Sequence, residues 1–457
     1  MATENFKVIV VGGSIAGLSL AHCLHRAGIE YVVLEKHGDI APQLGASVGV
    51  LPNGGRILDQ LGLYDAVEEL IAPLRVVHIT QPDGSSFSSN YPKVFNDRFG
   101  YPLAFLDRQK LLEILYTSLP STDNIHLNAE VVRIELQAKN AVVHTKSGVS
   151  YKGDLVVGAD GIRSCARSAM WGISPTITEQ DQSTMTVEYA CVFGISSPLE
   201  GLETGQQITC FNDGWSVLSV IGKGGRIYWF LMLKVDQKYP AASAPRFTRD
   251  DAIKECEARV RAHYWGGITF GDVWKARQVF SITALEEGLL QTWHTGRLVC
   301  IGDSVHKMAP NTGQGANSAI EDAAALTNLL RATLSTGQKP STTDLDTILH
   351  NFSRARIDRM KLVCESAGLA VRLHARDGLV KQILGRWALP YAGDFLANKA
   401  SQGVSQAVAL NFLPLPARSG AGWGVAPSGR GRVQLASIGA VILLGLLIQW
   451  NGAYIRY

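Results

Sequence analysis

An α/β fold with two interleaved parts is predicted by three observations along the chain. A glycine-rich strand, turn and helix stand at the N-terminus, aromatic-rich runs of period two fill 184–233, and an uncharged apolar run occupies 433–450. The first pattern is typical of a Rossmann-like domain, whereas strict alternation is typical of half-buried antiparallel strands. We therefore expect a Rossmann-like domain, an antiparallel-sheet domain interleaved with it, and a C-terminal transmembrane helix.

The composition describes a globular protein and excludes several classes. The chain has 457 residues, 46% of them hydrophobic, which is enough for a large core and more than one domain. Its 43 basic and 40 acidic side chains leave a net charge of only +3, so we expect no nucleic-acid partner. The seven cysteines show no CxxC spacing, and the chain has no HxH or HExxH pair. This pattern favours reduced thiols in the cytosol and no bound metal.

The first 35 residues predict a β-α-β unit, with strands over 7–11 and 31–34 and a helix over 15–27. Gly12 allows the tight turn after the first strand, and Gly17 lets the helix pack close to that strand. Ser14 stands where the GxGxxG pattern has its middle glycine, and so small a side chain still allows a phosphate to approach. Glu35 would accept hydrogen bonds from ribose hydroxyls, which favours FAD or NAD over NADP at this site.

A second strand end carries an acid next to a glycine. The sequence "GDLVVGADGIRSCAR" predicts a strand over 155–157, followed by Asp160 and Gly161 at the start of a helix. An acid in this place can bind a ligand hydroxyl. The same two residues could also form an ordinary turn, because Asp-Gly is a frequent turn sequence.

A third strand, predicted over 298–301, leads into Gly302 and Asp303. A loop with two more glycines follows, and then a long amphipathic helix from about Ala316. Glycines in such a loop would let backbone amides reach a flavin or a phosphate. His306 lies in the same loop, where we expect it to pack rather than to act as a general base.

These three motifs, in this order and at these separations, carry a resemblance to a known family. Residues 5–375 resemble the single-component FAD-dependent monooxygenases of the para-hydroxybenzoate hydroxylase type, which share "GGSIAG", the Asp-Gly pair and the Gly-Asp pair. The resemblance implies bound FAD and NADPH as a co-substrate that reduces it and leaves. In this family reduced FAD takes up O₂ as a C4a-hydroperoxide, while the protein supplies a dry cavity and orients the substrate.

The resemblance also implies roles for individual residues. Asp303 would contact the ribityl chain of the flavin, and Asp160 would lie near both FAD and the visiting NADPH. Arg108, at the head of the helix in "LDRQKLLEIL", would reach the flavin phosphates. Gly49 would contact the cofactor through its backbone, and Ala316 would lie beside the flavin.

The sheet predicted from about 76–100 and 181–285 would form the substrate domain. Its runs "MTVEYACVFGI", "QQITCFN", "WSVLSVIG" and "RIYWFLML" alternate as antiparallel strands do. In the family that the chain resembles, such a sheet covers the flavin ring and lines the substrate cavity. Tyr228 is therefore a candidate catalytic residue that would point at substrate, although a tyrosine in a strand more often packs. A helix over 250–265 is expected to pack on this sheet.

The end of the chain has a different composition. Residues 376–432 predict a helical extension and, from 411, a linker rich in proline and glycine. Residues 433–450 carry no charge and are long enough for a transmembrane helix, although a buried C-terminal helix is the alternative. Three arginines precede this segment and one follows it, namely Arg418, Arg430, Arg432 and Arg456. This bias predicts a single-pass membrane protein with a cytosolic catalytic domain. We expect the membrane to be that of the endoplasmic reticulum.

The tail narrows the choice of substrate. The wording of "GASVGVLPNGGRILDQLGL" and "GDSVHKMAPNTGQGAN" is most similar to the membrane-bound fungal branch of paxilline-pathway epoxidases. That resemblance implies a lipophilic prenylated substrate, namely a meroterpenoid or indole diterpene whose terminal farnesyl or geranylgeranyl alkene is epoxidised before a membrane-bound terpene cyclase acts. An aromatic-ring hydroxylase, a prenyl reductase and a non-catalytic membrane flavoprotein remain alternatives.

Overall fold

The computed structural model describes residues 6–43, 47–174, 178–393 and 395–424. Within these ranges, no helix is both long enough and apolar enough to cross a membrane. The predicted transmembrane segment 433–450 lies outside the described residues.

The Rossmann-like part is built on a six-stranded sheet with the order β19-β20-β11-β1-β2-β7. All neighbouring strands run parallel except β19, which is antiparallel to β20. The strands are β1 (Lys7–Val11), β2 (Glu30–Leu34), β7 (Ile125–His126), β11 (Leu155–Gly158), β19 (His294–Thr295) and β20 (Leu298–Cys300). The three strands expected before the three motifs are confirmed, with ends that differ by at most one residue. All three motifs therefore begin at the carboxyl edge of one sheet, where ligands of such folds bind.

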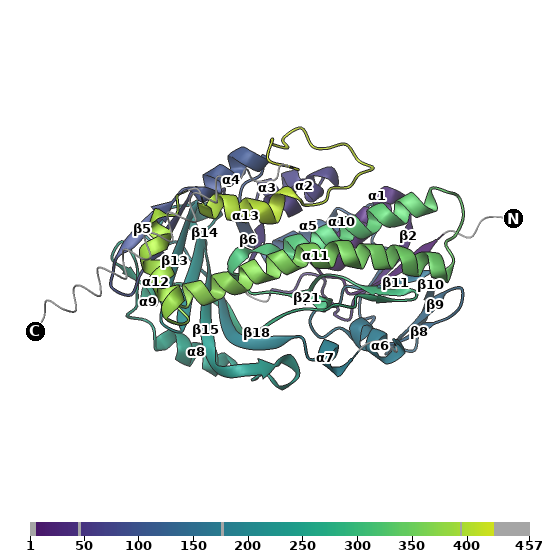
Figure 1. The fold of residues 1–457 in the computed structure, drawn as a ribbon, viewed down its shortest axis with the longest axis horizontal. Helices are drawn as coiled ribbons and strands as arrows, with labels where there is room; N and C mark the ends of the chain where they lie inside the picture. The colour runs from purple at the N-terminus through teal and green to yellow at the C-terminus, as the bar shows by residue number, and fades with distance from the viewer. Residues whose placement is uncertain (1–5, 44–46, 175–177, 394, 425–457) are drawn as a thin grey trace, which may run out of the picture.

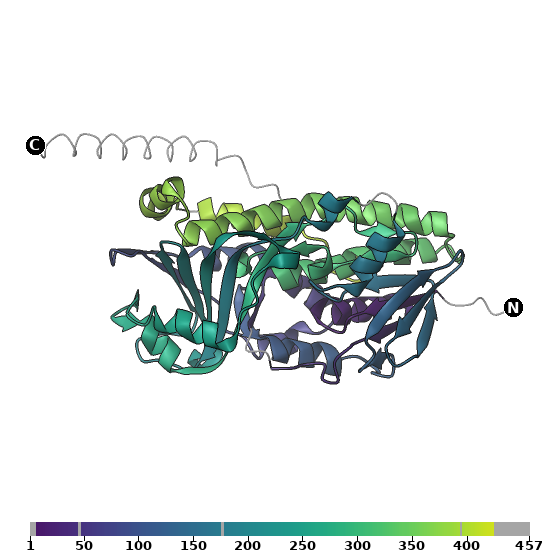
Figure 2. The ribbon, with the colours of Figure 1, turned by 90° about the horizontal axis from the view of Figure 1, so that it is seen from below.

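Long helices cover this sheet and connect it to the rest of the molecule. α1 (Ile15–Ala27) has the bounds that the sequence predicts, and it packs against α10 (Gln314–Leu334). α11 (Thr342–His374) runs beside α10 past both sheets (Figures 1 and 2). Its 33 residues correspond to about 50 Å at 1.5 Å per residue. One rigid helix thus contacts both halves of the molecule.

The second part is an eight-stranded sheet with the order β21-β18-β12-β15-β14-β13-β4-β5. Its strands are β4 (Val76–Thr80), β5 (Ser86–Ser89), β12 (Thr186–Ser196), β13 (Gln206–Asn212), β14 (Trp215–Ile221), β15 (Ile227–Pro240), β18 (Arg277–Leu289) and β21 (His306–Lys307). The four strands predicted between 184 and 233 are confirmed. β4 pairs with β13 across more than 100 residues of chain, so the sheet is interleaved with the Rossmann-like part as expected.

The two faces of the eight-stranded sheet pack against different elements. On the outer face, Trp229 and Leu231 join an apolar cluster with α8 (Arg249–Glu257) and α9 (Phe270–Lys275). On the inner face, Phe230 and Met232 join a cluster with α4 (Tyr91–Phe99), α11 and α13 (Phe395–Ser405). The inner face is therefore the one turned toward the rest of the molecule (Figure 2).

One helix ends earlier than the sequence suggests. The helix expected over 250–265 stops as α8 at Glu257, and residues 263–265 form a strand instead. Gly266 and Gly267 both have positive φ, and they connect β16 (His263–Trp265) to β17 (Ile268–Thr269) as a hairpin. Tyr264 is fully buried in the outer cluster, so burial of this aromatic residue in a strand overrides the helical periodicity.

The remaining elements surround the two sheets. They are α2 (Pro52–Gln60), α3 (Tyr64–Glu68), α5 (Arg108–Thr117), α6 (Cys165–Ile173), α7 (Glu179–Gln182), the pair β3 (Ser47–Val50) and β6 (Ala104–Asp107), and a three-stranded sheet of β8 (Val131–Leu136), β9 (Ala141–Thr145) and β10 (Ser150–Gly153). The C-terminal extension contains α12 (Leu379–Ile383), a π-helical turn (Leu384–Ala388), a short 3₁₀ turn (Leu389–Tyr391) and α13.

Residues 411–424 pack on the domain, which differs from the free linker that their composition suggests. The Gln60 side chain in α2 donates to the backbone oxygens of Leu410 and Leu413, and the Arg56 guanidinium stacks 3.6 Å from the Trp423 ring centroid. Gly420 and Trp423 both donate to the Phe99 carbonyl at the end of α4. Residues 411–424, which we call the strap, are therefore a segment rich in proline and glycine that packs against α2 and α4. The linker residues 425–432 lie outside the described residues.

Candidate functional site

The turn between β1 and α1 accepts only glycine at two positions. Gly12 has a φ of +106°, and a Cβ atom there would lie 2.5 Å from the Ala159 carbonyl oxygen. A Cβ atom on Gly17 would lie 1.9 Å from the carbonyl oxygen of Gly12. Both substitutions would require backbone to move, so the turn brings the start of α1 close to β1 and to the end of β11.

The Glu35 side chain contacts the backbone of this turn. It is buried and accepts hydrogen bonds from the backbone N–H of Gly13 at 2.7 Å and of His37 at 2.9 Å. A carboxylate offers about four acceptor positions, so each oxygen retains a lone pair for a ligand hydroxyl. The acid thus supports the turn and can also bind a ribose.

Arg108 is the first residue of α5 and points at the N-terminus of α1. Its Nη2 donates to Ser14 Oγ at 2.7 Å. Burial lowers the pKa of the Arg108 guanidinium below its usual value, and the neighbouring Asp303 and Glu35 carboxylates offset only part of this decrease. Ser14 makes no side-chain bond to the amides of α1, and the first turn of that helix carries no acid. Free amides and a half-buried guanidinium therefore face the same space, which suits a pyrophosphate.

Asp303 follows β20 in a short turn (Gly302–Ser304) and forms an ion pair with Lys307. Burial alone would lower the pKa of Lys307, but the Asp303 carboxylate reverses this, so the pKa of the ammonium is raised. The Arg108 guanidinium is also close enough to interact with Asp303. Two cations and one carboxylate therefore meet at the carboxyl edge of β20.

Asp160 has a structural role that its motif did not indicate. Its Oδ2 accepts from the backbone N–H of Cys165 at 2.7 Å and of Ala166 at 3.2 Å, and its Oδ1 accepts from Ser164 Oγ. The carboxylate thus binds the free amides at the start of α6. The contact with FAD and NADPH that the resemblance implies for Asp160 stays a prediction.

Gly49 and Ala316 lie at a third part of the site, where β3 meets the start of α10. Asn317 Nδ2 donates to the Gly49 carbonyl at 2.8 Å, and its Oδ1 accepts from the Leu51 N–H at 3.0 Å. Ala316 lies in the first turn of α10, beside Gly315, and a Cβ atom on Gly315 would meet no atom within 4 Å. Open space therefore adjoins this helix start, as a flavin beside Ala316 requires.

Tyr228 is buried in β15 on the inner face of the large sheet. Burial and the neighbouring Asp107 carboxylate raise the pKa of its phenol. Asp107 also accepts two hydrogen bonds from Arg226, at 3.1 and 2.9 Å, and it immediately precedes Arg108. The Tyr228 hydroxyl thus faces a charged pair that connects the sheet to α5. This position supports an anchoring role, and its predicted contact with substrate stays a prediction.

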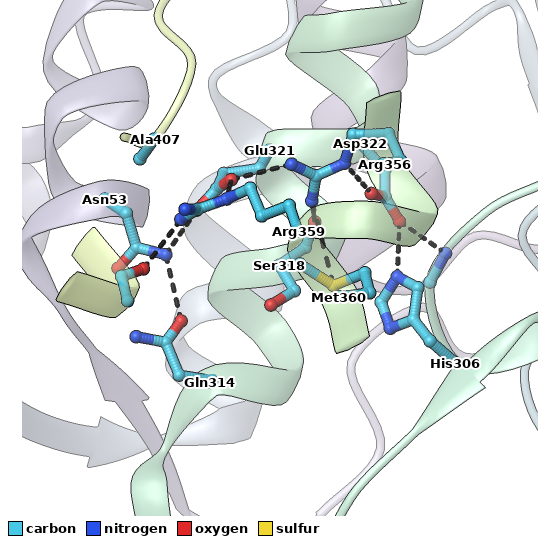
Figure 3. A network of polar contacts seen from close by, with 12 residues as sticks. Asn53, His306, Gln314, Ser318, Glu321, Asp322, Arg356, Arg359, Met360 and Ala407 are labelled. Carbon is cyan, nitrogen blue, oxygen red and sulfur yellow. Dashed lines mark hydrogen bonds and ion pairs between the residues drawn. The ribbon is translucent and has the colours of Figure 1, made fainter. Parts of the chain in front are cut away.

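A largely buried charge network holds α10 and α11 behind the site (Figure 3). Arg356 donates to Glu321 at 2.8 Å and to Asp322 at 2.6 Å, and Arg359 makes two further bonds to Glu321. Burial would raise the pKa values of both carboxyl groups, but nearby cationic side chains hold them below their usual range. Arg359 and Arg356 lower the pKa of Glu321, and His306 and Arg356 lower that of Asp322. The two acids are therefore ionised and paired.

This network reaches the flavin motif through Asp322. The Asp322 Oδ2 atom accepts from the Gly302 backbone N–H at 2.9 Å and pairs with His306 Nε2 at 2.6 Å. The His306 side chain has no solvent exposure and packs in the interior. Asp322 thus positions the turn that carries Asp303.

Sequence reasoning missed several of these residues. Lys307 and Asn317 gave no recognisable signal, because a lysine or asparagine in a loop or helix is common. The buried acids did leave one, since "NSAIEDAAAL" places two adjacent acids in a helix of small apolar residues. Buried acids need cationic partners, and the arginines of "SRARIDRM" were available to supply them.

The inner face of the large sheet supplies the other wall of the site. Phe193 and Phe230 contact edge to face with centroids 5.5 Å apart, and Phe105 from β6 lies 6.3 Å from Phe230. The same cluster contains Cys191, Leu218, Val220, Met232 and Leu285. An apolar wall therefore stands beside the polar cradle formed by the three motifs.

The cradle fits FAD on its own chemistry. Arg108 and the α1 amides suit the pyrophosphate, Glu35 suits the adenosine ribose, and Asp303 suits the hydroxyls of the ribityl chain. The open space at Gly315 leaves room beside α10 for the ring system.

Comparisons with known proteins agree with this assignment. A family model described as FAD binding domain matches residues 5–355. The FAD-dependent monooxygenase cdmI of Talaromyces verruculosus is 53% identical over 430 residues, which cover 92% of this chain and 90% of the relative. The FAD-dependent monooxygenase atmM of Aspergillus flavus is 51% identical, with 92% of this chain and 89% of the relative covered.

Among solved structures, HpxO of Klebsiella pneumoniae in complex with FAD and uric acid has a similar fold. Its TM-score is 0.71 at 23% sequence identity, and the match covers 87% of this chain and 96% of that one. The chain therefore belongs to the FAD-binding monooxygenases of the para-hydroxybenzoate hydroxylase type, and it is an FAD-dependent monooxygenase.

Proposed function

We propose that this monooxygenase uses NADPH and O₂ to epoxidise the terminal alkene of a farnesyl or geranylgeranyl chain. The prenyl chain would belong to a meroterpenoid or indole-diterpene precursor in a fungal secondary-metabolite pathway. The observation that carries the proposal is the apolar inner face of the eight-stranded sheet, where Phe193, Phe230 and Met232 stand beside the flavin cradle.

The side chains on the inner face of the eight-stranded sheet bear on whether the reacting group is an alkene or a phenol. A buried phenol hydroxyl needs a hydrogen-bond partner, since leaving it unpaired costs roughly 1–3 kcal/mol. A prenyl alkene needs none, and it gains free energy by leaving water, at about 25 cal/mol per Å² of buried apolar area. The inner-face cluster consists mainly of apolar side chains, together with Tyr91 and with Tyr189, whose hydroxyl donates to Asp377. The Tyr228 hydroxyl on the same face lies beside the Asp107 carboxylate. This arrangement favours the prenyl chain over an aromatic ring.

Residues of this chain would divide the remaining tasks among them. Bound FAD, once reduced by NADPH, supplies the oxygen-transfer chemistry. Arg108 and the amides of α1 hold its pyrophosphate, while Glu35 and Asp303 hold its sugar hydroxyls. Phe193, Phe230 and Met232 exclude water and orient the apolar chain.

The membrane placement belongs to the same proposal. The uncharged run 433–450 would anchor the protein in the endoplasmic reticulum membrane, with Arg430 and Arg432 keeping the catalytic domain in the cytosol. Prenylated substrates partition into the bilayer, so the anchor would raise the local concentration of substrate. A membrane-bound terpene cyclase would then receive the epoxide without its release into water.

The test incubates membranes that contain the protein with NADPH, ¹⁸O₂ and a panel of prenylated aromatics. We expect a product heavier by one ¹⁸O atom, which acid converts to a diol because the oxygen is an epoxide. An acid-stable phenol carrying the label would identify a ring hydroxylase. Hydrogen gain without O₂ uptake would identify a prenyl reductase.

A non-catalytic role in the membrane is tested separately. Asp303→Ala should abolish product and weaken FAD binding if the cradle serves catalysis. Normal product formation in the pathway by the Asp303→Ala protein would contradict the proposed function and favour a scaffold.

A further inference from the structure

An exposed apolar patch lies on the C-terminal extension, far from the flavin cradle. Its members are Leu379 and Val380 of α12, with 75% and 69% of their surface exposed, and Trp387 and Tyr391 of the following turns, with 45% and 74% exposed. We call these four residues the α12 patch. Exposed apolar residues that gather on one surface, in contrast to single ones, mark sites of contact with proteins or membranes.

The segment that carries the patch is firmly held from beneath. Gln81 Nε2 donates to the Gly385 carbonyl at 3.0 Å, and Leu389 packs on the cluster formed by Val77, Ile79 and Phe211. At the rim, Arg386 pairs with Asp83 at 3.0 Å. The inner side chains thus fix the segment on the β4–β5 hairpin and β13, and the patch residues are left facing outward.

The described part of the chain ends within reach of the α12 patch. Gly424, the last described residue, donates its N–H to the Ser405 carbonyl at the end of α13. α13 begins four residues after Tyr391, and its eleven residues are about 16 Å long. The eight residues 425–432 can span at most about 29 Å. The uncharged run 433–450 can therefore start within reach of the α12 patch.

We propose that the α12 patch inserts into the interface of the lipid bilayer, as a second membrane contact beside the tail. Exposed leucine and valine would enter the acyl region, while Trp387 and Tyr391 would lie at the level of the headgroups, where these two residue types are enriched. The α4, α12 and α13 end of the molecule then faces the membrane, and the N-terminal end points away from it (Figure 1).

This orientation has a consequence for substrate access. α4, α11 and α13 contribute Phe95, Val371 and Val404 to the apolar cluster on the inner face of the sheet. With the patch in the bilayer, the apolar wall of the site lies at the membrane-facing end of the domain. The inference rests on the membrane placement within the proposed function, but it does not require the epoxidation chemistry.

The experiment uses the full chain bound to phosphatidylcholine vesicles, with a nitroxide label on Val380→Cys. Electron paramagnetic resonance measures collisions of the label with O₂, which concentrates in the acyl region, and with a water-soluble nickel chelate. Val132→Cys is the matched control, because Val132 is also an exposed valine, with 55% of its surface accessible, and it lies on β8 at the other end of the molecule (Figure 1). Labelling of the unsubstituted protein corrects for Cys165 and Cys364, which are partly accessible.

We expect the ratio of O₂ to nickel accessibility to be at least fivefold higher at Val380→Cys than at Val132→Cys. Equal ratios at the two sites would show that the patch faces water and would overturn the proposal. Low accessibility to both reagents would mean that protein covers the patch, either the tail or a second copy, and would also overturn it.

Two further readings separate this proposal from the proposed function. A chain that does not float with the vesicles contradicts both membrane contacts. A buried label together with no oxygenated product would support the docking surface and contradict the epoxidase. An oxygenated product formed while the label stays in water would support the epoxidase and contradict the docking surface.

Discussion

The carboxyl edge of the six-stranded sheet and the inner face of the eight-stranded sheet form the two walls of one site, and they differ in chemistry. The first wall carries Glu35, Arg108, Asp303 and Lys307, each paired or hydrogen-bonded. The second is a continuous apolar cluster around Phe230. A charged cofactor with fixed hydroxyls and phosphates requires the first kind of wall, and a flexible hydrocarbon chain requires only the second.

This difference shows how tightly each wall is specified. An ionised group at the cradle needs a partner at hydrogen-bond distance, so few residue types fit each position. An apolar wall keeps its function under many exchanges of similar volume. The cofactor half should therefore respond strongly to single substitutions and the sheet half weakly, and four measurements test this expectation.

The largest effect is expected for Arg356→Ala behind the cradle. Removing the cation leaves Glu321 and Asp322 buried without their shared partner, which should lower the free energy of unfolding by about 3–5 kcal/mol. The loss should shrink below about pH 4, because protonated carboxyl groups no longer need the cation. Chemical unfolding at several pH values measures it.

Lys93→Ala provides the control for that experiment. Lys93 pairs with Asp97 at the surface, where both side chains are more than half exposed, so the change should stay below about 1 kcal/mol. Equal losses for the two variants would remove the distinction between the buried network and an ordinary ion pair.

The next effect is expected at Arg108, within the cradle itself. Arg108→Ala removes a half-buried donor aimed at the pyrophosphate site, and such charge-assisted bonds contribute roughly 1.5–3 kcal/mol. FAD affinity should therefore fall about 10- to 100-fold, measured by flavin fluorescence. Arg133→Ala, in an exposed ion pair on β8, should leave affinity unchanged. FAD binding that is unaffected by Arg108→Ala would contradict the cradle.

His374, which packs against the eight-stranded sheet, makes the stability of this half of the molecule depend on pH. His374 stacks on Phe211 in β13, and burial lowers its pKa to about 4. In the unfolded chain its pKa is about 6.5, so between pH 6.5 and 4 the unfolded state binds more protons than the folded state. The stability that the neutral ring provides above pH 6.5 is lost as the pH falls through this window, by on the order of 2 kcal/mol.

His374→Gln should make the free energy of unfolding depend less steeply on pH, because the glutamine side chain does not take up a proton in this range. The measurement is the free energy of unfolding against pH from 4 to 7, for both proteins. Identical slopes in the two proteins would show that His374 is not held neutral in the folded state.

The smallest effect is expected at the apolar wall. Phe193→Ser should raise the KM for a prenylated substrate roughly fivefold, corresponding to about 1 kcal/mol of lost apolar contact, and should leave FAD affinity unchanged. Ile282→Ser, on the outer face of the same sheet, should leave KM unchanged. A larger KM effect from the outer face would show that the substrate does not lie along Phe193.

The same difference explains what the sequence could predict. The β1–α1 turn has strict geometric needs, so its glycines, its helix and Glu35 could be placed from pattern alone. The resemblance assigned both Arg108 and Asp303 to the flavin site, and the structure brings their side chains close enough to interact. Apolar residues of the inner face carry no such pattern, because their common wall arises from strands far apart in the chain.

Other features depended on contacts that no local pattern records. The Asp160 carboxylate caps α6, and Lys307 folds back on Asp303. The strap 411–424 packs on α2 and α4, although its composition suggested a free linker. The first two contacts are local, because five and four residues separate the partners, but the sequence does not show which side chains turn toward one another. The strap depends on tertiary partners in α2 and α4, which lie far away in the chain.

The shared helix α11 has a consequence for how the lengths of related chains can vary. It carries Arg356 in the buried network and, eighteen residues later, His374 beside β13. Inserting one residue between them would rotate the second group by about 100° relative to the first. We therefore expect insertions and deletions to collect in surface turns such as the one after β15, while this part of α11 keeps a constant length.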